Sequence, residues 1–338
     1  MLKRKKRKKR KQLRTVCQSY SSIKKISKSS RNNDCEKVVV KAPINFSLIN
    51  NAEVVTEFFC EVRQYLLGKK NKKTQMFFDL SKIENVTIDA IIYLLAMIKN
   101  LQRLGLAKYR FVGNLPQKES VREQFTESGF LDFVKSRICT IESNSNKIAI
   151  RTGQKNDSIV LKEICDFIIE KTGCSRLATK GLYVIMAEMM YNTSEHAYIS
   201  RSYSMKNWYV FVEYAQERVK ITFMDTGDSI PKTMRKKWQE TFLRAPDDKM
   251  IISALNGECR SRTRLDNRNN GLPTIKANAE AHKIENLHIL SNRAICVLCD
   301  KDGKFSYNTR EQKKAIMGTL YYWEIPMKIL RENDDASY

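Results

Sequence analysis

The sequence predicts an α/β protein with two domains and a basic N-terminal arm. Its 338 residues exceed the length of one ordinary domain, and 42% of them are hydrophobic, which is enough to fill two cores. Strand-like and helical segments alternate along most of the chain, as in proteins whose sheets are covered by helices. Positive charge is concentrated at one end, where ten of the first 14 residues are Lys or Arg.

Residues 1–35 are predicted to form a disordered arm, because a run of like charges repels itself and buries no apolar surface. The formal net charge of the chain is +24, and the start of the arm supplies ten of these charges. Nucleic acid is the first partner that such an arm suggests, since release of counterions from phosphates drives binding. An anionic membrane surface is the second, and a solubilising tail without a partner is the alternative.

Two features favour a cytoplasmic protein without a transmembrane segment. The longest apolar run, residues 90–98, is far shorter than the roughly 20 residues that a membrane helix needs. The nine cysteines are scattered and follow no signal peptide, as is usual for free thiols in a reducing compartment. Cys296 and Cys299 form a single C-x-x-C in an apolar stretch, so we expect core packing rather than a metal or redox role.

Residues 36–138 are predicted to form the first domain, an α/β unit in which helices cross over between strands. Its strand-like segments are β-branched or aromatic, and its helical segments repeat apolar residues every three or four positions. The predicted strands are residues 37–40, 75–80 and 109–113, and the predicted helices are residues 52–67, 87–104 and 120–134.

A hairpin and linker over residues 139–157 are expected to join this domain to a second one, residues 158–328, which a tail over 329–338 follows. A long polar segment, residues 232–268, interrupts the second domain. Its predicted helices are residues 159–172, 179–197 and a helix from about 273, and its predicted strands are residues 207–214, 218–225, 286–291, 294–299 and 319–325.

The predicted helix near residues 181–197 carries a polar stripe beside its apolar face. Glu188, Asn192 and His196 are four residues apart, so each lies only about 40° around the helix from the previous one. An Asn side chain can offer a hard oxygen to Mg²⁺, and a Glu can deprotonate an attacking group. On its own, this spacing is more typical of the solvated edge of an amphipathic helix.

Asp225 ends a predicted strand and is followed by Gly227 and Ile230. A carboxylate at a strand end can accept a hydrogen bond from the amino group of adenine, and a glycine lets the chain approach the flat base closely. The alternative is an ordinary turn that leaves a strand.

Two further segments could contact a nucleotide. One contains Arg268, Gly271 and Leu272 and leads into a helix that a proline at its start favours. Free N–H groups and a cationic side chain at that point can bind phosphates. The other is Thr319, whose hydroxyl could reach a base or a bound water from the start of a strand. Each segment alone also fits an ordinary loop or strand end.

In order and spacing, these motifs resemble the GHKL superfamily of ATP-binding domains over about residues 155–328. That superfamily includes sensor histidine kinases, gyrase, the MutL repair proteins and anti-sigma-factor kinases. The matching residues are Glu188, Asn192, His196 and Ala197 for E-x-x-x-N-x-x-x-H-A, Asp225, Gly227, Ile230 and Pro231 for D-x-G-x-G-I-P, and Gly271, Leu272, Gly318 and Thr319 for the later glycine and G-T motifs.

The resemblance implies a Bergerat-type α/β sandwich that binds ATP together with Mg²⁺. It makes Glu188 the general base, Asn192 the Mg²⁺ ligand and Asp225 the residue that reads adenine. The other residues expected at the nucleotide are Gly227, Ile230, Arg268, Gly271, Leu272 and Thr319.

The chain departs from the family pattern at two places, and its histidines bear on which branch of the family it resembles. Ser229 replaces the second glycine of the aspartate motif and could narrow the base pocket. Asn269 stands where a glycine is usual, a mild change because Asn tolerates left-handed geometry. His282 and His288 lack the surroundings of a phosphoacceptor histidine, which argues against a sensor histidine kinase.

The first domain resembles STAS-like domains, the fold of anti-sigma-factor antagonists. The resemblance is carried by residues 76–81, ending in Asp79-Leu80-Ser81, and by residues 86–90, ending in Asp89-Ala90. Family members that act as phosphorylation switches have Ser or Thr directly after that second aspartate. Ala90 therefore implies a domain that docks protein partners without such a switch, and the alternative is that the nearby Ser81 or Thr87 takes the phosphate instead.

These motifs predict a Mg²⁺-dependent ATPase or ATP-driven regulatory switch. A protein serine/threonine kinase of the anti-sigma-factor type is the nearest alternative. A third interpretation is a nucleic-acid-associated protein whose nucleotide site gates shape without hydrolysis. Residues 232–268 would be the lid over the nucleotide, and the arginines in that segment could contact phosphates.

Overall fold

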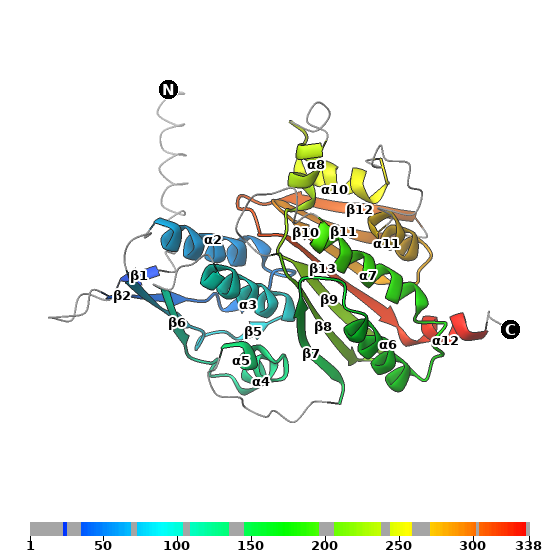
Figure 1. The fold of residues 1–338 in the computed structure, drawn as a ribbon, viewed down its shortest axis with the longest axis horizontal. Coiled ribbons are helices and arrows are strands. Elements are labelled where there is room, and N and C mark those ends of the chain that lie inside the picture. Colours follow the sequence, from blue (N-terminus) through cyan, green and yellow to red (C-terminus); the bar gives the residue numbers. More distant parts are fainter. Residues whose placement is uncertain are drawn as a thin grey trace, which may run out of the picture.

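The structure, a computed structural model, describes residues 23–25, 35–68, 73–103, 109–134, 145–195, 206–237, 244–258, 271–301 and 304–335. These residues form a mixed α/β protein with one sheet of four strands, one of seven and a small pair, which confirms the predicted α/β class (Figure 1). Within this part of the chain, no helix is both long and apolar enough to cross a membrane.

Three parallel strands form the centre of the N-terminal unit, by which we mean the described residues up to 134. They alternate with helices, as the sequence predicts, and their sheet has the order β1-β2-β4-β6. The strands are β1 (Ile23–Lys25), β2 (Cys35–Lys41), β4 (Lys73–Asp79) and β6 (Tyr109–Gly113), with a separate pair β3 (Asn45–Phe46) and β5 (Asn85–Val86). The helices are α2 (Ala52–Gly68), α3 (Ile88–Arg103), α4 (Glu119–Glu127) and α5 (Phe130–Val134).

Two predictions for this unit are wrong. Residues 23–25 were assigned to the disordered arm, but β1 pairs antiparallel with β2 and satisfies the N–H and C=O groups of that edge. The rest of residues 1–35 lies outside the described ranges except for Cys35, which begins β2. The helix predicted over 120–134 is divided into α4 and α5, because Gly129 has a φ of +75° and ends the first helix.

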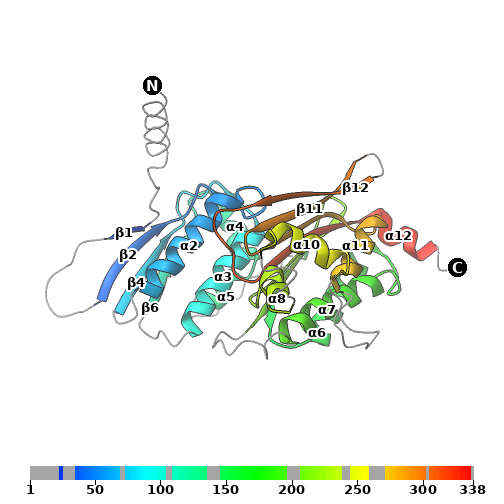
Figure 2. The same cartoon turned by 90° about the horizontal axis from the view of Figure 1, so that it is seen from above.

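Helix α3 lies between the two main sheets and is buried on nearly all sides. Every residue from 89 to 98 is buried, which explains why this apolar run has no polar face. On one side α3 packs in the N-terminal unit, and on the other it contacts strands of the larger sheet (Figure 2). One hydrophobic core therefore joins the two parts of the molecule.

The larger sheet is antiparallel and has the order β12-β11-β10-β13-β9-β8-β7. Alternate residues of β8 face opposite sides: Tyr209 and Phe211 join the core shared with the N-terminal unit, while Val210 and Val212 face the helices α6 and α7. The strands are β7 (Lys147–Gly153), β8 (Trp208–Ala215), β9 (Arg218–Asp225), β10 (Glu285–Ser291), β11 (Ala294–Lys301), β12 (Lys304–Glu311) and β13 (Thr319–Pro326).

Helices cover the face of this sheet that the N-terminal unit leaves free (Figure 1). The Asp157 side chain caps α6 by accepting hydrogen bonds from Ile159 and Val160, and Gly173 ends that helix with a φ of 71°. The helices are α6 (Ser158–Thr172), α7 (Lys180–Glu195), α8 (Ile230–Lys237), α10 (Asp247–Leu255), α11 (Gly271–Glu280) and α12 (Met327–Asp335).

Several boundaries in this half need correction. Residues 147–153, most of which were predicted as one arm of a joining hairpin, form a strand, β7, but it pairs with β8 as the edge of the larger sheet; residues 139–144 lie outside the described ranges. The polar segment 232–268 contains most of α8 and the whole of α10, which are held by buried residues such as Met234, Met250 and Leu255.

Two further elements were not predicted. The strand β12 pairs along the edge strand β11, so its hydrogen bonds rather than its own polar sequence hold it in place. The supposed tail from 329 belongs to α12, because Ile329 and Leu330 are buried.

Candidate functional site

Two polar residues of α7 meet the first residue of α11. The apolar face of α7, with Ile185 and Met189, packs into the core, and this leaves Glu188 and Asn192 half-buried at its edge. Gly271 lies so close that a Cβ atom on it would be 2.8 Å from a carboxylate oxygen of Glu188 and 3.3 Å from the amide nitrogen of Asn192. Gly271 therefore lets α11 begin close to the ends of these two side chains.

We call these three residues, Glu188, Asn192 and Gly271, the Glu188 cluster. Neither polar side chain hydrogen-bonds to another residue in the described part of the chain. Desolvation by burial raises the pKa of the Glu188 carboxyl group. The first N–H groups of α11 have no partner within the helix and form the positive end of its dipole. The cluster can thus hold an anion beside a proton acceptor and an amide oxygen.

Asp225, at the end of β9, is the centre of a second group. Its Oδ1 atom accepts a hydrogen bond from the Gly227 N–H at 2.8 Å. Thr319 lies opposite it on β13 and hydrogen-bonds to the same carboxylate. The Thr319 Oγ1 is 2.9 Å from Ser291 Oγ, which in turn accepts the Ile230 N–H at 2.9 Å. We call these five residues the Asp225 cluster.

Gly318 precedes this cluster and is required there for two reasons. Its φ of +70° lies in the left-handed region that favours glycine. A Cβ atom on it would also lie only 1.8 Å from the backbone oxygen of Asp225. The glycine of the predicted G-T motif therefore permits β13 to begin beside the end of β9.

The charge on Asp225 depends on pH near neutrality. Desolvation by burial raises the pKa of Asp225 to about 7, although the Gly227 N–H and the Lys206 ammonium both act to lower it. Lys206 is only 8% exposed, and desolvation lowers its pKa in turn. Its Nζ atom lies 3.7 Å from an Asp228 carboxylate oxygen. Protonation of Asp225 would turn one of its two acceptor oxygens into a hydrogen-bond donor.

The N-terminal unit contacts the two chain segments that flank the Asp225 cluster. In α3, the Tyr93 hydroxyl oxygen accepts the Met317 N–H at 2.7 Å, in the segment that leads into β13. Further along α3, Arg103 donates to the Asn207 side-chain oxygen at 2.7 Å. The Asn207 N–H donates to the Thr226 hydroxyl oxygen, and the Thr226 N–H donates to the Asn207 carbonyl oxygen. A shift of α3 would therefore displace the chain segments on both sides of the cluster.

Seven of the nine sequence-predicted site residues belong to these two clusters, and an eighth, Leu272, lies beside one of them. Leu272 follows Gly271 in α11 and packs, half-buried, on the same core as Ile230. Arg268 lies outside the described residues, as do Asn269, His196 and Ala197. Helix α10 contacts both α8 and α11, so it connects the helix that follows Asp225 with the helix that begins at the Glu188 cluster.

Ser229, the departure from the aspartate motif, has a structural role in α8. Its side chain is buried, and its Oγ accepts the Lys232 N–H at 3.4 Å while its carbonyl oxygen accepts the Thr233 N–H at 2.9 Å. The hydroxyl thus helps to start a helix, a task for which serine is well suited.

Three residues of the site were missed by sequence reasoning. Lys206 and Asn207 precede β8 without any recognisable motif, and Ser291 is one of several polar residues that end strands. The only available signal was that Ser291 ends a predicted strand, as Asp225 does. Its pairing with Thr319 depends on the register of β10 and β13.

The two cysteines of the C-x-x-C pair differ in burial: Cys299 is only half-buried and lies outside the core, so core packing is not found for it. Cys296 is buried in the core, and desolvation raises its pKa to about 12, so the expected core packing of this residue is confirmed. Among the described residues, no group of three or more His, Cys, Asp or Glu side chains is arranged to hold a metal.

No family model matches the chain, and no curated protein matches it either.

Proposed function

We propose that the chain is a Mg²⁺-dependent ATP-binding protein of the GHKL type that works as an ATP-driven regulatory switch. The observation that carries this proposal is the meeting of four short motifs in two clusters. Gly271 contacts Glu188 and Asn192, and the strand that starts at Thr319 lies beside Asp225. Each motif alone fits an ordinary helix edge, turn or strand start. Unrelated features of these kinds would not be expected to lie beside one another in the fold.

The residues present fit a nucleotide and its metal. The Asn192 amide oxygen is a hard ligand of the kind that Mg²⁺ prefers, and it makes no hydrogen bond among the described residues. The N–H groups at the start of α11 would hold phosphate oxygens. Bound Mg²⁺ would neutralise phosphate charge during transfer of the terminal group. Asp225 would accept the adenine amino group while Gly227 leaves room for the base.

Glu188 would serve as the general base. It lies one helical turn from Asn192, and its raised pKa makes it a better proton acceptor than an exposed carboxylate. The group from which it takes the proton would decide the reaction. A water gives an ATPase, and a Ser or Thr hydroxyl of a partner gives a protein kinase.

The N-terminal unit would be a STAS-like docking domain that regulates the nucleotide site. Its parallel strands with crossover helices support this assignment. Ala90 is fully buried in α3, so that position is neither chemically nor sterically suited to phosphorylation. The contacts of Tyr93 and Arg103 with the segments beside Asp225 provide a route from a docked partner to the nucleotide.

One experiment distinguishes the ATPase, the protein kinase and the nucleotide-gated binding protein. Full-length protein is incubated with Mg²⁺ and ATP labelled on the γ-phosphate, with and without DNA, RNA and candidate protein substrates. Label in free phosphate indicates an ATPase, and label on protein indicates a kinase. ATP binding with no transfer indicates the nucleotide-gated, nucleic-acid-associated protein, provided that DNA or RNA is also bound. Equal affinity of wild type, Asn192→Ala and Asp225→Asn for Mg²⁺-ATP would exclude this site.

A further inference from the structure

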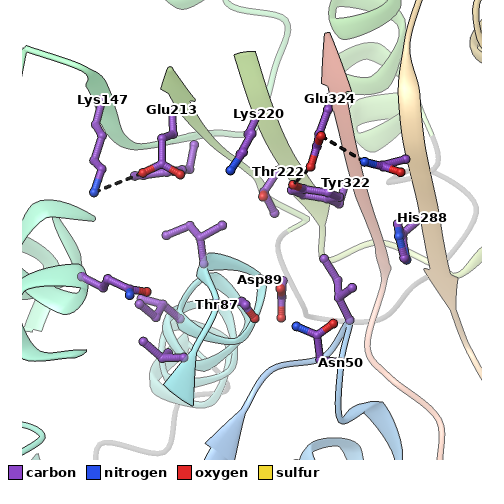
Figure 3. Close-up of a pocket in the computed structure, with 17 residues that line it drawn as sticks. Asn50, Thr87, Asp89, Lys147, Glu213, Lys220, Thr222, His288, Tyr322 and Glu324 are labelled. Carbon is purple, nitrogen blue, oxygen red and sulfur yellow. Dashed lines mark hydrogen bonds and ion pairs between the residues drawn. The ribbon is translucent and has the colours of Figure 1, made fainter. Parts of the chain in front are cut away.

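The N-terminal unit has one covered side and one open side. On the covered side, α3 packs toward the larger sheet beside a cavity of about 430 Å³ (Figure 3). Polar groups that line this cavity already bond to one another, as Glu213 does with Lys147 and Glu324 with Tyr322. On the open side lies the other face of the four-stranded sheet. Figure 2 shows α2 and α3 on one side of β2, β4 and β6 and no described helix on the other.

Alternate residues of the three parallel strands form this second face. The residues between them, such as Val38, Met76 and Phe78, point the other way and are buried in the core that contains α2 and α3. Strand register arranges the outward residues in three rows across the sheet, which we call the open face: Lys37, Gln75 and Arg110, then Val39, Phe77 and Val112, then Lys41, Asp79 and Asn114.

The middle row of the open face is apolar and has the Phe77 ring at its centre. Val39, Phe77 and Val112 are each partly exposed, and they belong to neither hydrophobic core. Parallel sheets are normally covered on both faces. An apolar row that no described residue covers, at the centre of such a sheet, therefore indicates a surface that binds a partner.

Cations lie on both sides of this apolar row. Lys37 and Arg110 precede it and Lys41 follows it, each two residues along its strand, or about 6.6 Å. All three are exposed, and none forms a hydrogen bond or ion pair with a described residue. Asp79 is the one acid in the three rows, and its Oδ1 already accepts two side-chain hydrogen bonds within the unit. The open face thus combines excess positive charge with an accessible aromatic ring.

We propose that the open face binds single-stranded nucleic acid. A base would stack on Phe77 while the lysines and the arginine contact the phosphates on either side of it. A duplex keeps its bases paired and stacked, and a membrane surface offers no ring to Phe77, so both use only the charges. Charge elsewhere in the chain favours the same polyanion, because the basic run of residues 3–14 precedes β1, the edge strand of this sheet. The open face is separate from the Glu188 and Asp225 clusters, and the proposal does not involve ATP.

Fluorescence anisotropy of the full-length protein with a labelled, unstructured oligonucleotide tests the proposal across a salt series. RNA and DNA single strands should each bind at least about fivefold more tightly than the duplex of the same sequence, as expected for one stacked base. The triple variant Lys37→Gln, Lys41→Gln, Arg110→Gln should bind at least about tenfold more weakly, and its salt slope should fall by about 2, as for three lost phosphate contacts.

A matched triple variant controls for the loss of net charge. Lys155, Lys162 and Lys180 are also exposed and form no ion pair with a described residue, but they lie before α6, in α6 and at the start of α7. Their replacement by Gln should change affinity by less than about twofold, because charges farther from the nucleic acid than a Debye length are screened.

Phe77→Ala separates stacking from charge. It should weaken binding at least about fivefold without changing the salt slope, because it removes a ring and no cation. Photocrosslinking of wild type to an oligonucleotide that contains 4-thiouridine then locates the contact. After digestion with trypsin, the crosslink should lie on the peptide between Lys73 and Lys82, which contains Phe77.

Circular dichroism establishes that each variant is folded. If Phe77→Ala unfolds, the exposed triple variant and the crosslink keep the test decisive. The proposal is overturned if the open-face triple variant binds as tightly as the control triple variant, or if the duplex binds as well as the single strands. It is also overturned if every crosslink lies before residue 23, or if the protein prefers vesicles of anionic phospholipid to the oligonucleotide.

Discussion

The Glu188 and Asp225 clusters differ in the number of hydrogen bonds that hold their side chains in place. The Asp225 cluster is joined by hydrogen bonds among β9, β10, β13 and the start of α8. In the Glu188 cluster, neither polar side chain hydrogen-bonds to a described residue, and only close packing against Gly271 holds it together. A preformed cluster can recognise a ligand with little reorganisation, whereas polar atoms without partners are available for chemistry. Under the proposed function, the Asp225 end would select the ligand and the Glu188 end would act on it.

Glu188→Gln should separate the two clusters most clearly. Loss of a general base should reduce phosphate transfer by about 10²–10⁴ while ATP affinity stays nearly unchanged, because glutamine keeps the shape of the side chain. Transfer rate and affinity are measured on the same preparation. Glu170→Gln, on the exposed side of α6, is the matched control and should change neither. A parallel loss of affinity in Glu188→Gln would mean that this cluster also selects the ligand.

Gly318→Ala should damage the Asp225 cluster by forcing β13 away from β9. The added Cβ would clash with the Asp225 carbonyl, so we expect ATP affinity to fall by about 100-fold and stability by about 3 kcal/mol. Gly173→Ala is a matched control with nearly the same φ, +71°, and open space around the position of the Cβ. It should cost only about 1 kcal/mol and leave affinity unchanged. Titration and denaturant unfolding measure both effects, and equal losses in the two variants would contradict the steric explanation.

Asp225 should make ATP affinity depend on pH. Its pKa of about 7 means that the carboxylate form, which accepts the adenine amino group, is lost as pH falls. Affinity should decrease about tenfold between pH 8 and pH 6. In Asp225→Asn the dependence should disappear, and discrimination between ATP and GTP should weaken. An unchanged pH profile in this variant would assign the titration to another group.

The same carboxyl group should reduce stability at high pH. Because its folded pKa is raised above the unfolded value, its stabilising effect is fully present below pH 4 and is lost as pH rises through about 7. Asp225→Asn should therefore raise the melting temperature relative to wild type at pH 8 and less so at pH 5. Thermal unfolding at the two values checks the sign, and a gain only at pH 5 would contradict it.

Arg103→Met should have the smallest effect and tests the contact from the N-terminal unit. It removes the bond to Asn207, which lies beside the Asp225 cluster and outside it. We expect ATP affinity to fall only about twofold to fivefold, as for one hydrogen bond acting indirectly. Arg122→Met, on the exposed surface of α4, is the control. A loss as large as that of Gly318→Ala would show that α3 controls the cluster directly.

Much of the secondary structure could be predicted because it depends on local sequence. The apolar run of β8, the alternating pattern of β9 and the apolar stripe of α7 are visible in short windows, and their predicted ends are within two residues of the observed ones. The elements that the sequence did not predict share one cause. Strands β1 and β12 are held by a neighbouring strand, and α10 and α12 by buried contacts that their own polar sequences do not reveal.

The sequence alone determined the α/β class, the order of most elements, and the residue types at the ends of α7, β9 and β13. Only the tertiary structure decided that Gly271 contacts Glu188, that Ser291 bonds to Thr319, and that α3 lies between two sheets beside a cavity. The physical reason is the range of the forces involved. Dihedral preferences and periodicity act between neighbours in the chain, whereas strand register and burial bring together residues that are far apart in it.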